Sequence, residues 1–333
     1  MNGVPFLVDK NIKSVYLFKR RQFFCFFLPG GHVKKVLITG GTVFVSKFTA
    51  KYFVEKGYQV YVLNRGSKPQ VEGVTFIRGD RHDIKGKLEG LSFDAVIDIT
   101  AYKEADIRDF VGSIPKFETY IMISSSAVYS DKAFLPYKEE AELSENKIWT
   151  WYGTDKIAAE RALLEMVPEA YILRPPYLYG QMNNVYREAF VFDCAMADRK
   201  FYLPRDGEMK LQFLHVRDLC RIIEKIIEER PNDHILNVGN KTSVTVKQWV
   251  EACYKVAGKN AEFENVYQNI MQRAYFSFFD YDYSLDVTKQ HTLVKEDIDL
   301  IEGLKECFDW YKDNQDEVIK KPYIQYIDEN LSH

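Results

Sequence analysis

Tyr152 and Lys156 are four residues apart in the stretch WYGTDK, so a helix would place both side chains on one face. An ammonium group close to a phenol favours the phenolate and lowers the phenol pKa. A tyrosine prepared in this way can act as a general acid or base toward a hydroxyl or carbonyl group. An ordinary surface pair is the alternative, because the chain has 22 tyrosines and the pattern is short.

Three serines come before this pair, in the stretch SSSAVY, directly after the apolar run Tyr120–Ile123. Open α/β sheets bind their ligands beyond the carboxyl ends of their strands. If the apolar run is a strand, its end places these hydroxyl groups where a ligand would bind. We therefore expect one of the serines to share a site with Tyr152.

A second candidate site lies in KKVLITGGTVFVSK, which has the pattern of a strand, a glycine turn and a helix. Free N–H groups and the helix dipole at such a turn attract phosphate. Val43 and Ser46 stand where dinucleotide-binding turns have glycines for close approach of the pyrophosphate and tight helix packing. The Val43 side chain can point away from the phosphate and Ser46 is small, so a dinucleotide site is predicted. A simple strand–helix turn is the alternative.

Residues at the ends of the second and third predicted strands indicate which cofactor would bind. An acidic residue after the second strand would bind the ribose of NAD, and a basic residue can accommodate the extra phosphate of NADP. The chain has Asn64 and Arg65 there, which favours NADP, although Arg65 could also stack on adenine or face solvent. Asp80 is placed to meet the adenine edge, and a solvated Asp80 is the alternative.

Short apolar runs alternate with amphipathic stretches from Lys34 onward, which is typical of βαβ units in a parallel sheet. Strands are expected at 35–39, 59–64, 74–80, 95–100, 119–125 and 170–180, and helices at 46–57, 154–167, Val216–Glu229 and Val246–Val256. The predicted fold class is α/β, a Rossmann-type doubly wound parallel sheet with a smaller C-terminal lobe. Residues 34–180 would form the NAD(P)-binding domain, and residues 181–333 mainly a substrate-binding lobe interleaved with the sheet.

The composition sets limits on the partners. A net charge of -3 with dispersed charges gives no general attraction to nucleic acid. The five cysteines are odd in number and widely spaced, so reduced thiols and no metal site are expected. No stretch approaches the length of a membrane span. A cytoplasmic protein is the expectation.

Residues 1–33 need a separate interpretation. Basic residues precede the apolar run Phe23–Leu28, as in a signal peptide, but the run is shorter than the roughly 7–15 residues such a peptide needs. The segment is predicted to be a disordered extension, or translated upstream sequence with the native start near Val33. The intact mass of the native protein would decide between them.

Several ordered motifs together resemble one family. From Lys34 to about Lys312, the stretches TGGTVF, SSSAVY, YGTDK, LRPPYLYG, QFLHVRDL and LNVGN resemble the extended or atypical short-chain dehydrogenase/reductases, the NAD-dependent epimerase/dehydratase family. The resemblance implies a catalytic set of Ser125, Tyr152 and Lys156, with Ser126 as the fallback for the hydroxyl. Lys156 would also bind the nicotinamide ribose, and the segment 174–180 would lie beside the nicotinamide.

The predicted ligand contacts fall into two groups. Those to NAD or NADP are Thr39, Gly40, Gly41, Thr42, Val43, Phe44, Asn64, Arg65, Asp80, Arg81, Lys156, Arg174, Pro175 and Tyr177. Those to the substrate are Ser126, Asn183, Asn184 and Arg187, since an arginine can hold a phosphate with two hydrogen bonds. A solvated helix start is the alternative for the last three. The aromatic run Tyr275–Asp286 could stack on a base or sugar, or pack in the core.

The departures from the family narrow the function. Sugar 4,6-dehydratases have a Thr-Asp-Glu run where this chain has Ser126 and Ala127, so dehydration is not supported. The expectation is an NAD(P)-dependent epimerase or reductase acting on a sugar-like small molecule, free or nucleotide-linked, with Tyr152 as the proton shuttle. The glycine turn looks closest to an atypical branch that includes the chloroplast stem-loop binding proteins. A non-catalytic NAD(P)-binding or RNA-associated protein is therefore the alternative. A homodimer could form through a helix pair that includes the Tyr152 helix.

Overall fold

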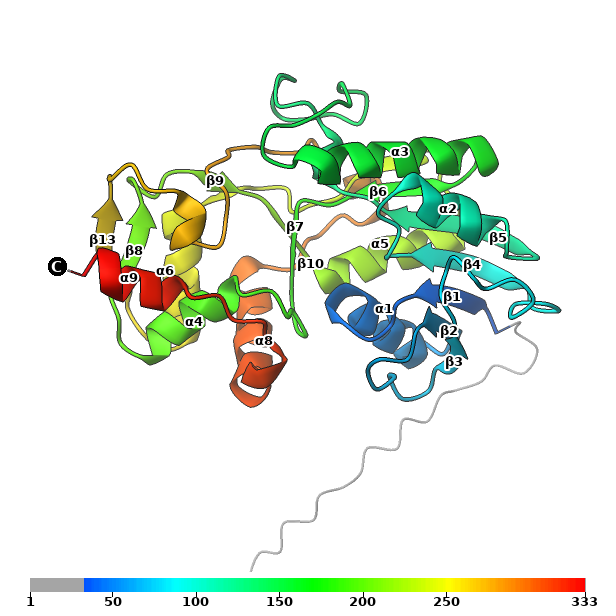
Figure 1. The fold of residues 1–333 in the computed structure, drawn as a ribbon, viewed down its shortest axis with the longest axis horizontal. Coiled ribbons are helices and arrows are strands. Elements are labelled where there is room, and N and C mark those ends of the chain that lie inside the picture. The colour runs from blue at the N-terminus through cyan, green and yellow to red at the C-terminus, as the bar shows by residue number, and fades with distance from the viewer. Residues whose placement is uncertain (1–32, 333) are drawn as a thin grey trace, which may run out of the picture. The chain divides into compact units, whose positions relative to one another are not determined.

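A seven-stranded parallel sheet dominates the computed structural model, which describes residues 33–332 (Figure 1). The prediction for residues 1–33 therefore lies, except for Val33, outside the described residues. The strand order is β11-β6-β5-β4-β1-β2-β3. The strands are β1 Lys35–Thr39, β2 Gln59–Asn64, β3 Thr75–Arg78, β4 Phe93–Asp98, β5 Phe117–Ile123, β6 Tyr171–Arg174 and β11 Ile235–Asn237. The predicted Rossmann-type fold is confirmed.

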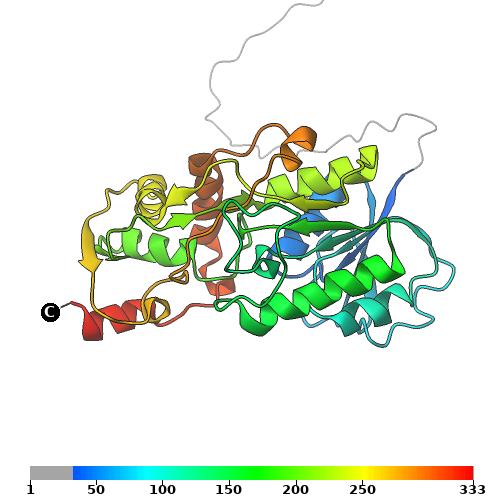
Figure 2. The same cartoon turned by 90° about the horizontal axis from the view of Figure 1, so that it is seen from above.

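Helices cover both faces of this sheet (Figures 1 and 2). One face packs against α1 Phe44–Glu55 and α5 Val216–Glu229, and the other against α2 Glu104–Val111 and α3 Thr150–Met166. Successive residues of β1 serve the two cores in turn, since Val36 and Ile38 pack with α1 and α5 whereas Leu37 packs with α2 and α3. Apolar residues are needed on both sides, which explains the apolar runs without alternation.

The second half of the chain forms a smaller lobe and also enters the sheet, because β11 is the edge strand beside β6. The helices of this half outside the sheet are α4 Glu188–Met196, α6 Val246–Val256, α7 Gln290–Leu293, α8 Leu300–Asp313 and α9 Tyr323–Asn330. Its strand pairs are β7 Tyr177–Tyr179 with β10 Phe213–His215, β8 Phe201–Pro204 with β13 Phe263–Val266, and β9 Lys210–Leu211 with β12 Val244–Thr245. Three short 3₁₀ helices are η1 Ser126–Val128, η2 Gln272–Ala274 and η3 Gln315–Glu317.

The predicted elements match the structure most closely where the apolar period is longest. The bounds of α5 and α6 are those expected, whereas α1 begins and ends two residues earlier than the predicted 46–57. The expected strand 170–180 divides into β6 and β7, because Pro175 and Pro176 interrupt it. In the described residues, four cysteines are free and buried, and Cys25 lies outside them. No helix in this part of the chain could span a membrane.

Candidate active site

Two adjoining cavities form one trough along the carboxyl edge of the sheet. The first, of about 540 Å³, is here called the Tyr152 cavity and is lined by residues that include Ser125, Tyr152 and Lys156. The second, of about 440 Å³, is called the glycine-turn cavity and is lined by residues that include Gly40, Arg65 and Asp80. The cavities share the lining residues Val43, Thr100 and Tyr102. Both predicted sites thus open into the same trough.

The glycine turn tolerates no side chain at its two glycines. Gly40 and Gly41 have φ angles of 91° and 89°, in the left-handed region that side chains disfavour. A Cβ atom on Gly40 would lie 2.8 Å from Ser46 Oγ, and one on Gly41 would lie 2.8 Å from Val62 Cγ1. Ser46 is buried and donates its hydroxyl to the Val43 carbonyl at 2.9 Å. The serine therefore keeps the tight helix crossing that a third glycine usually provides.

Helix α1 begins at this turn with a strained residue and no side-chain cap. Phe44 has a φ of 35°, and the residue before it, Val43, provides no side-chain hydrogen bond to cap α1. Residues 43–46 line the Tyr152 cavity, so the positive end of the helix faces the trough. The residues present fit the phosphate groups of a dinucleotide.

Arg81 was predicted to contact the cofactor, and it lines the glycine-turn cavity, but its guanidinium is held by hydrogen bonds within the protein. Its Nη2 donates to Asp98 Oδ2 at 2.7 Å, and its Nε donates to the Asp106 carbonyl at 3.0 Å. Its Nη1 donates to Asp98 Oδ1 at 3.1 Å and Thr100 Oγ1 at 3.2 Å, and Nη2 also donates to the Asp106 carbonyl. Burial would raise the pKa of Asp98, but the charge and hydrogen bonds of Arg81 outweigh it and hold the pKa below its ordinary value. All five donors of the guanidinium are used inside the protein.

Thr39 and Asn64 also shape the turn instead of offering free groups to a ligand. Thr39 Oγ1 donates to Asp98 Oδ1 at 2.8 Å and accepts from the backbone N–H of Ile99 at 2.9 Å. Asn64 Nδ2 donates to the Gly40 carbonyl at 2.6 Å, which ties the end of β2 to the turn. Both residues still line the glycine-turn cavity, so their predicted cofactor contacts stay predictions. Arg65 and Asp80, which were also predicted to contact the cofactor, are exposed and line the glycine-turn cavity.

The first turn of α3 brings Tyr152 beside Ser125. A Cβ atom on Gly153 would lie only 2.4 Å from the Ala127 carbonyl oxygen, so only glycine lets α3 pass this close to η1. Burial raises the pKa of Tyr152, and a hydrogen bond with Ser125 opposes this shift. The predicted lowering of the phenol pKa by Lys156 is not found. Gly153 was not among the predicted site residues. Its position directly after Tyr152, inside a predicted helix, could have indicated a close contact there.

Lys156 is buried on the same helix and is held by the backbone. Its ammonium donates to the Ala101 carbonyl at 2.6 Å and to the Ile123 carbonyl at 2.9 Å. It also lies 4.9 Å from the centre of the Tyr102 ring. Desolvation lowers the pKa of Lys156 to about 8, against the attraction of Asp98. The side chain therefore carries a positive charge in the trough at neutral pH.

The three serines after β5 have different partners. Ser124 donates its hydroxyl to the buried Glu160 carboxylate. Ser126 is buried and donates to the Tyr283 hydroxyl at 3.2 Å, although it too lines the Tyr152 cavity. Ser125 is half-buried, and its side chain meets Tyr152. The structure thus favours Ser125 over the fallback Ser126 as the hydroxyl partner of Tyr152.

Only some of the residues that were predicted to bind the cofactor from the end of β6 and the loop after it line the trough. Pro175 and Tyr177 line the Tyr152 cavity. Arg174 does not, because it is buried in an ion pair with Glu160 at 2.6 Å and also donates to the Tyr129 hydroxyl at 3.0 Å. The predicted cofactor contact of Arg174 is therefore wrong. Its side chain joins α3 to β6.

Of the residues predicted to contact the substrate, again only some line the Tyr152 cavity. Asn184 and Arg187 line the Tyr152 cavity. Asn183 is buried elsewhere, where its Nδ2 donates to Glu188 Oε1 at 2.8 Å and its Oδ1 accepts from the Val185 N–H at 3.0 Å. The predicted substrate contact of Asn183 is therefore wrong. The cavity also contains Tyr102 and Trp149, which the sequence analysis did not select, although Tyr102 follows the end of β4.

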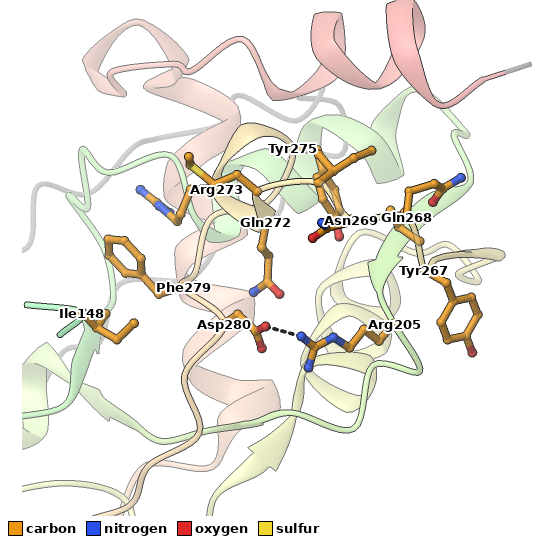
Figure 3. A pocket seen from close by; sticks show the side chains of 13 residues that line it. Ile148, Arg205, Tyr267, Gln268, Asn269, Gln272, Arg273, Tyr275, Phe279 and Asp280 are labelled. Carbon is orange, nitrogen blue, oxygen red and sulfur yellow. Dashed lines mark hydrogen bonds and ion pairs between the residues drawn. The ribbon is translucent and has the colours of Figure 1, made fainter. Parts of the chain in front are cut away.

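A third cavity, of about 420 Å³, lies in the smaller lobe and is called the lobe cavity. Figure 3 shows Gln272 extending into it toward the ion pair of Arg205 and Asp280. It adjoins the Tyr152 cavity, because Ile148 lines one and Trp149 the other, and the Trp149 and Phe279 rings are 5.3 Å apart.

The aromatic run Tyr275–Asp286 divides between cavity walls and core. Tyr275 and Phe279 line the lobe cavity, and Tyr283 lines the Tyr152 cavity. Phe276 and Phe278 are buried in the core of the smaller lobe. Core packing therefore accounts for part of the run, as one of the two interpretations expected.

Comparisons with known proteins agree with this geometry. The profile of the NAD dependent epimerase/dehydratase family matches residues 113–239. The chain is 30% identical over 301 residues to the chloroplast stem-loop binding protein of 41 kDa b of Arabidopsis thaliana, covering 83% of this chain and 78% of the relative. It is 24% identical to the dTDP-D-glucose 4,6-dehydratase of Homo sapiens, covering 86% of this chain and 92% of that protein.

The fold is shared with solved enzymes. The UDP-glucuronic acid 4-epimerase of Bacillus cereus, solved in complex with NAD, aligns with a TM-score of 0.66 at 18% identity. The alignment covers 84% of this chain and 96% of that one. At this identity the match shows the fold alone, and the relative at 30% identity carries the assignment. The protein therefore belongs to the NAD dependent epimerase/dehydratase family, a group of extended short-chain dehydrogenase/reductases.

Proposed function

We propose that the protein is an NAD(P)-dependent epimerase or reductase that acts on a hydroxyl or carbonyl group of a sugar-like substrate. The observation that carries this proposal is the meeting of Ser125, Tyr152 and Lys156 in one cavity that continues into the glycine turn. A protein that only bound the cofactor would need the turn but not this set of hydroxyl and ammonium groups.

The chain's own residues offer a place for each part of the cofactor. The N-terminus of α1 with Gly40 and Gly41 would hold the pyrophosphate. Arg65 and Asp80 would face the adenosine end, and Lys156, Pro175 and Tyr177 the nicotinamide end. When bound, the nicotinamide accepts a hydride from a carbinol carbon or returns one to a carbonyl carbon.

Tyr152 would move the proton that accompanies this hydride. Its raised pKa keeps the phenol protonated at neutral pH, so it can donate its proton to a substrate oxygen as a carbonyl is reduced. Ser125 would hydrogen-bond the same oxygen. In the oxidising direction the phenolate form of Tyr152 would accept the proton from the substrate hydroxyl. Lys156 adds a positive charge to the lining of the same cavity, which favours negative charge there.

Dehydration of a sugar has no support in this site. Ser126 and Ala127 stand where a proton-donating acid would be needed, and no carboxylate is among the residues that line the Tyr152 cavity. The dTDP-D-glucose 4,6-dehydratase of Homo sapiens is related, but its reaction is not proposed here.

A nucleotide-linked substrate is favoured by the lobe cavity. Its lining includes Arg205 and Arg273, and the Arg273 guanidinium lies 4.9 Å from the centre of the Phe279 ring. An aromatic ring and cationic groups suit a base and its phosphates. The sugar would then lie in the adjoining Tyr152 cavity.

A second candidate function is non-catalytic binding of RNA. The observation that favours it is the similarity to the stem-loop binding protein of Arabidopsis thaliana. The net charge of -3 argues against a broad phosphate-binding surface.

Replacing Tyr152 by phenylalanine separates the two functions. Native mass spectrometry and titration with NAD(H) and NADP(H) first establish the bound cofactor, and turnover of free and UDP-linked sugars is then followed by nicotinamide absorbance and product analysis. Tyr152→Phe should lower kcat by at least about 10²-fold while cofactor affinity stays unchanged. Tyr58→Phe, outside the trough, is the matched control. Unchanged kcat in Tyr152→Phe would remove the proposed proton shuttle.

A further inference from the structure

We propose that Arg187 binds an anionic group of the substrate, a carboxylate or a phosphate, close to the carbon at which the reaction takes place. This inference rests on the proposed function in one respect, since it takes Tyr152 to face that carbon. It adds the chemical class of the substrate, which would be an acidic sugar derivative.

In the part of the chain that the structure describes, Arg187 forms no ion pair, although its charge opposes the rise in the pKa of the neighbouring Glu188 that burial causes. The one hydrogen bond of Arg187 among these residues is long, from Nη1 to the Leu178 carbonyl at 3.4 Å. The neighbouring Glu188 is buried and bonded to Asn183, and it does not line the cavity. A guanidinium has five N–H donors, so most of them remain available to a ligand.

The lining of the Tyr152 cavity is cationic as a whole. Among its residues are Lys156 and Arg187, and none is aspartate or glutamate. The ammonium of Lys156 is already held by two backbone carbonyls, whereas the Arg187 guanidinium makes one long hydrogen bond and forms no ion pair with a described residue. A partly buried charge without a partner is costly, and an anionic ligand would remove that cost.

Arg187 lies among the phenols of the reaction site. Its guanidinium carbon is 5.4 Å from the centre of the Tyr177 ring. Its charge also lowers the pKa of Tyr152, against the larger effect of burial. Arg187 and Tyr152 line the same cavity, so an anion held by Arg187 would share that cavity with the carbon that faces Tyr152.

A second polar group without a partner lies at the same place. The Tyr177 hydroxyl is buried and makes no hydrogen bond to any described residue. Asn184 adds an amide to the same lining. A carboxylate or phosphate has enough acceptor oxygens to take hydrogen bonds from Arg187, Tyr177 and Asn184 together.

The experiment uses matched ligand pairs that differ in charge at one carbon. The cofactor-loaded protein is titrated calorimetrically with D-glucuronate against D-glucose and UDP-glucuronate against UDP-glucose. Glucose 6-phosphate is added to separate a phosphate from a carboxylate preference. The titrations are repeated with Arg187→Gln, Arg187→Lys and, as the matched control, Arg161→Gln, whose side chain lies on the outer side of α3.

The member of at least one pair that carries the carboxylate should bind about tenfold or more tightly than the member without it. Arg187→Gln should abolish this preference, Arg187→Lys should keep part of it, and Arg161→Gln should leave it unchanged. Equal affinity within every pair, or a preference that survives in Arg187→Gln, would overturn the proposal. Weaker cofactor binding in Arg187→Gln with an unchanged preference would also overturn it, because the guanidinium would then contact the cofactor.

These outcomes are independent of the proposed enzyme function. A preference for acidic ligands that depends on Arg187 would stand even if Tyr152→Phe showed no loss of turnover. Conversely, turnover that depends on Tyr152 with no preference for acidic ligands would leave the function in place and remove only the role of Arg187.

Discussion

Arg174 and Glu160 form an ion pair at 2.6 Å inside the protein, where their side chains are 2% and 4% exposed. Burial would lower the pKa of Arg174, but the attraction of Glu160 outweighs it and raises the pKa above its ordinary value. Glu160 is on α3, one turn beyond Lys156, and Arg174 ends β6. The pair therefore holds the helix of Tyr152 and Lys156 against the sheet.

Breaking this pair from one side should destabilise the protein. Arg174→Met leaves a buried carboxylate without its partner, and such a change costs about 3–5 kcal/mol. The double variant Arg174→Met/Glu160→Met should lose much less, since it removes both charges. Urea unfolding of the two variants measures this difference. If Arg174→Met were instead stable but no longer bound the cofactor, the result would support the cofactor contact that the sequence predicts for Arg174.

The fold was accessible from the sequence because apolar periodicity reports burial directly. The runs at β1, β2 and β5 show strands covered on both faces, and the period of α5 and α6 defines their ends. The short helix α2 was not predicted, because its eight residues EADIRDFV span only about two turns and half of them are charged. The lobe beyond Gly180 was also predicted only in outline, since its pairs β8–β13 and β9–β12 join strands far apart in the chain.

The candidate site was accessible only where a residue's role depends on its neighbours in sequence. The spacing of Tyr152 and Lys156 and the serines after β5 are local features, and the structure brings them together. Arg81 was predicted to contact the cofactor, and Asn183, which follows the nicotinamide loop, was predicted to contact the substrate. Their partners Asp98 and Glu188 are buried by tertiary packing that residue types alone do not reveal.

Gly153→Ala should separate Tyr152 from Ser125. The new Cβ atom would lie 2.4 Å from the backbone oxygen of Ala127, so α3 must move away from η1. Overpacking of this kind lowers the free energy of unfolding by about 1–3 kcal/mol. The fall in kcat should be larger than this loss of stability alone would cause. Gly112→Ala is the control, because its φ is -65° and its nearest contact would be 3.3 Å. Wild-type kcat in Gly153→Ala would show that the close crossing is not needed.

Lys156 should give the apoprotein a distinctive stability profile at alkaline pH. Its pKa is lowered from 10.5 to about 8, chiefly by desolvation, so between these values the unfolded chain binds more protons than the folded one. The contribution of Lys156 to the free energy of unfolding therefore rises with pH in this window, by up to about 1.4 kcal/mol per unit. Urea unfolding at several pH values should show that, above pH 8, the free energy of unfolding of wild type rises relative to that of Lys156→Met. Parallel profiles would contradict the lowered pKa.

His215 should make the protein sensitive to acid. Burial, aided by Arg217, lowers its pKa from 6.5 to about 3, so the folded protein keeps the ring neutral while the unfolded chain protonates it. Stability from this group is present above pH 6.5 and is lost as the pH falls toward 3. Among the residues that the structure describes, Glu306 is the acid that lies within 4 Å of the ring, at 3.8 Å.

The test of His215 compares unfolding in urea at pH 7 and pH 4.5. His215→Gln should be less stable than wild type at pH 7, because the ring accepts a hydrogen bond from the Arg217 N–H, but it should lose less on acidification. His234→Gln is the matched control, since that ring is partly exposed and should leave the acid dependence unchanged. An equal loss in His215→Gln would show that other groups set the acid sensitivity.

Arg65 should determine which cofactor is preferred. Asn64 is bound to the Gly40 carbonyl, so Arg65 is the charged side chain at the end of β2 that faces the glycine-turn cavity. A cation there favours the extra phosphate of NADP, and we expect NADPH to bind more tightly than NADH. Arg65→Asp should shift the ratio of the two dissociation constants by about tenfold or more toward NADH. Lys68→Asp, an exposed change outside the lining, controls for a general effect of charge. A ratio that is the same in wild type and Arg65→Asp would place the ribose phosphate away from β2.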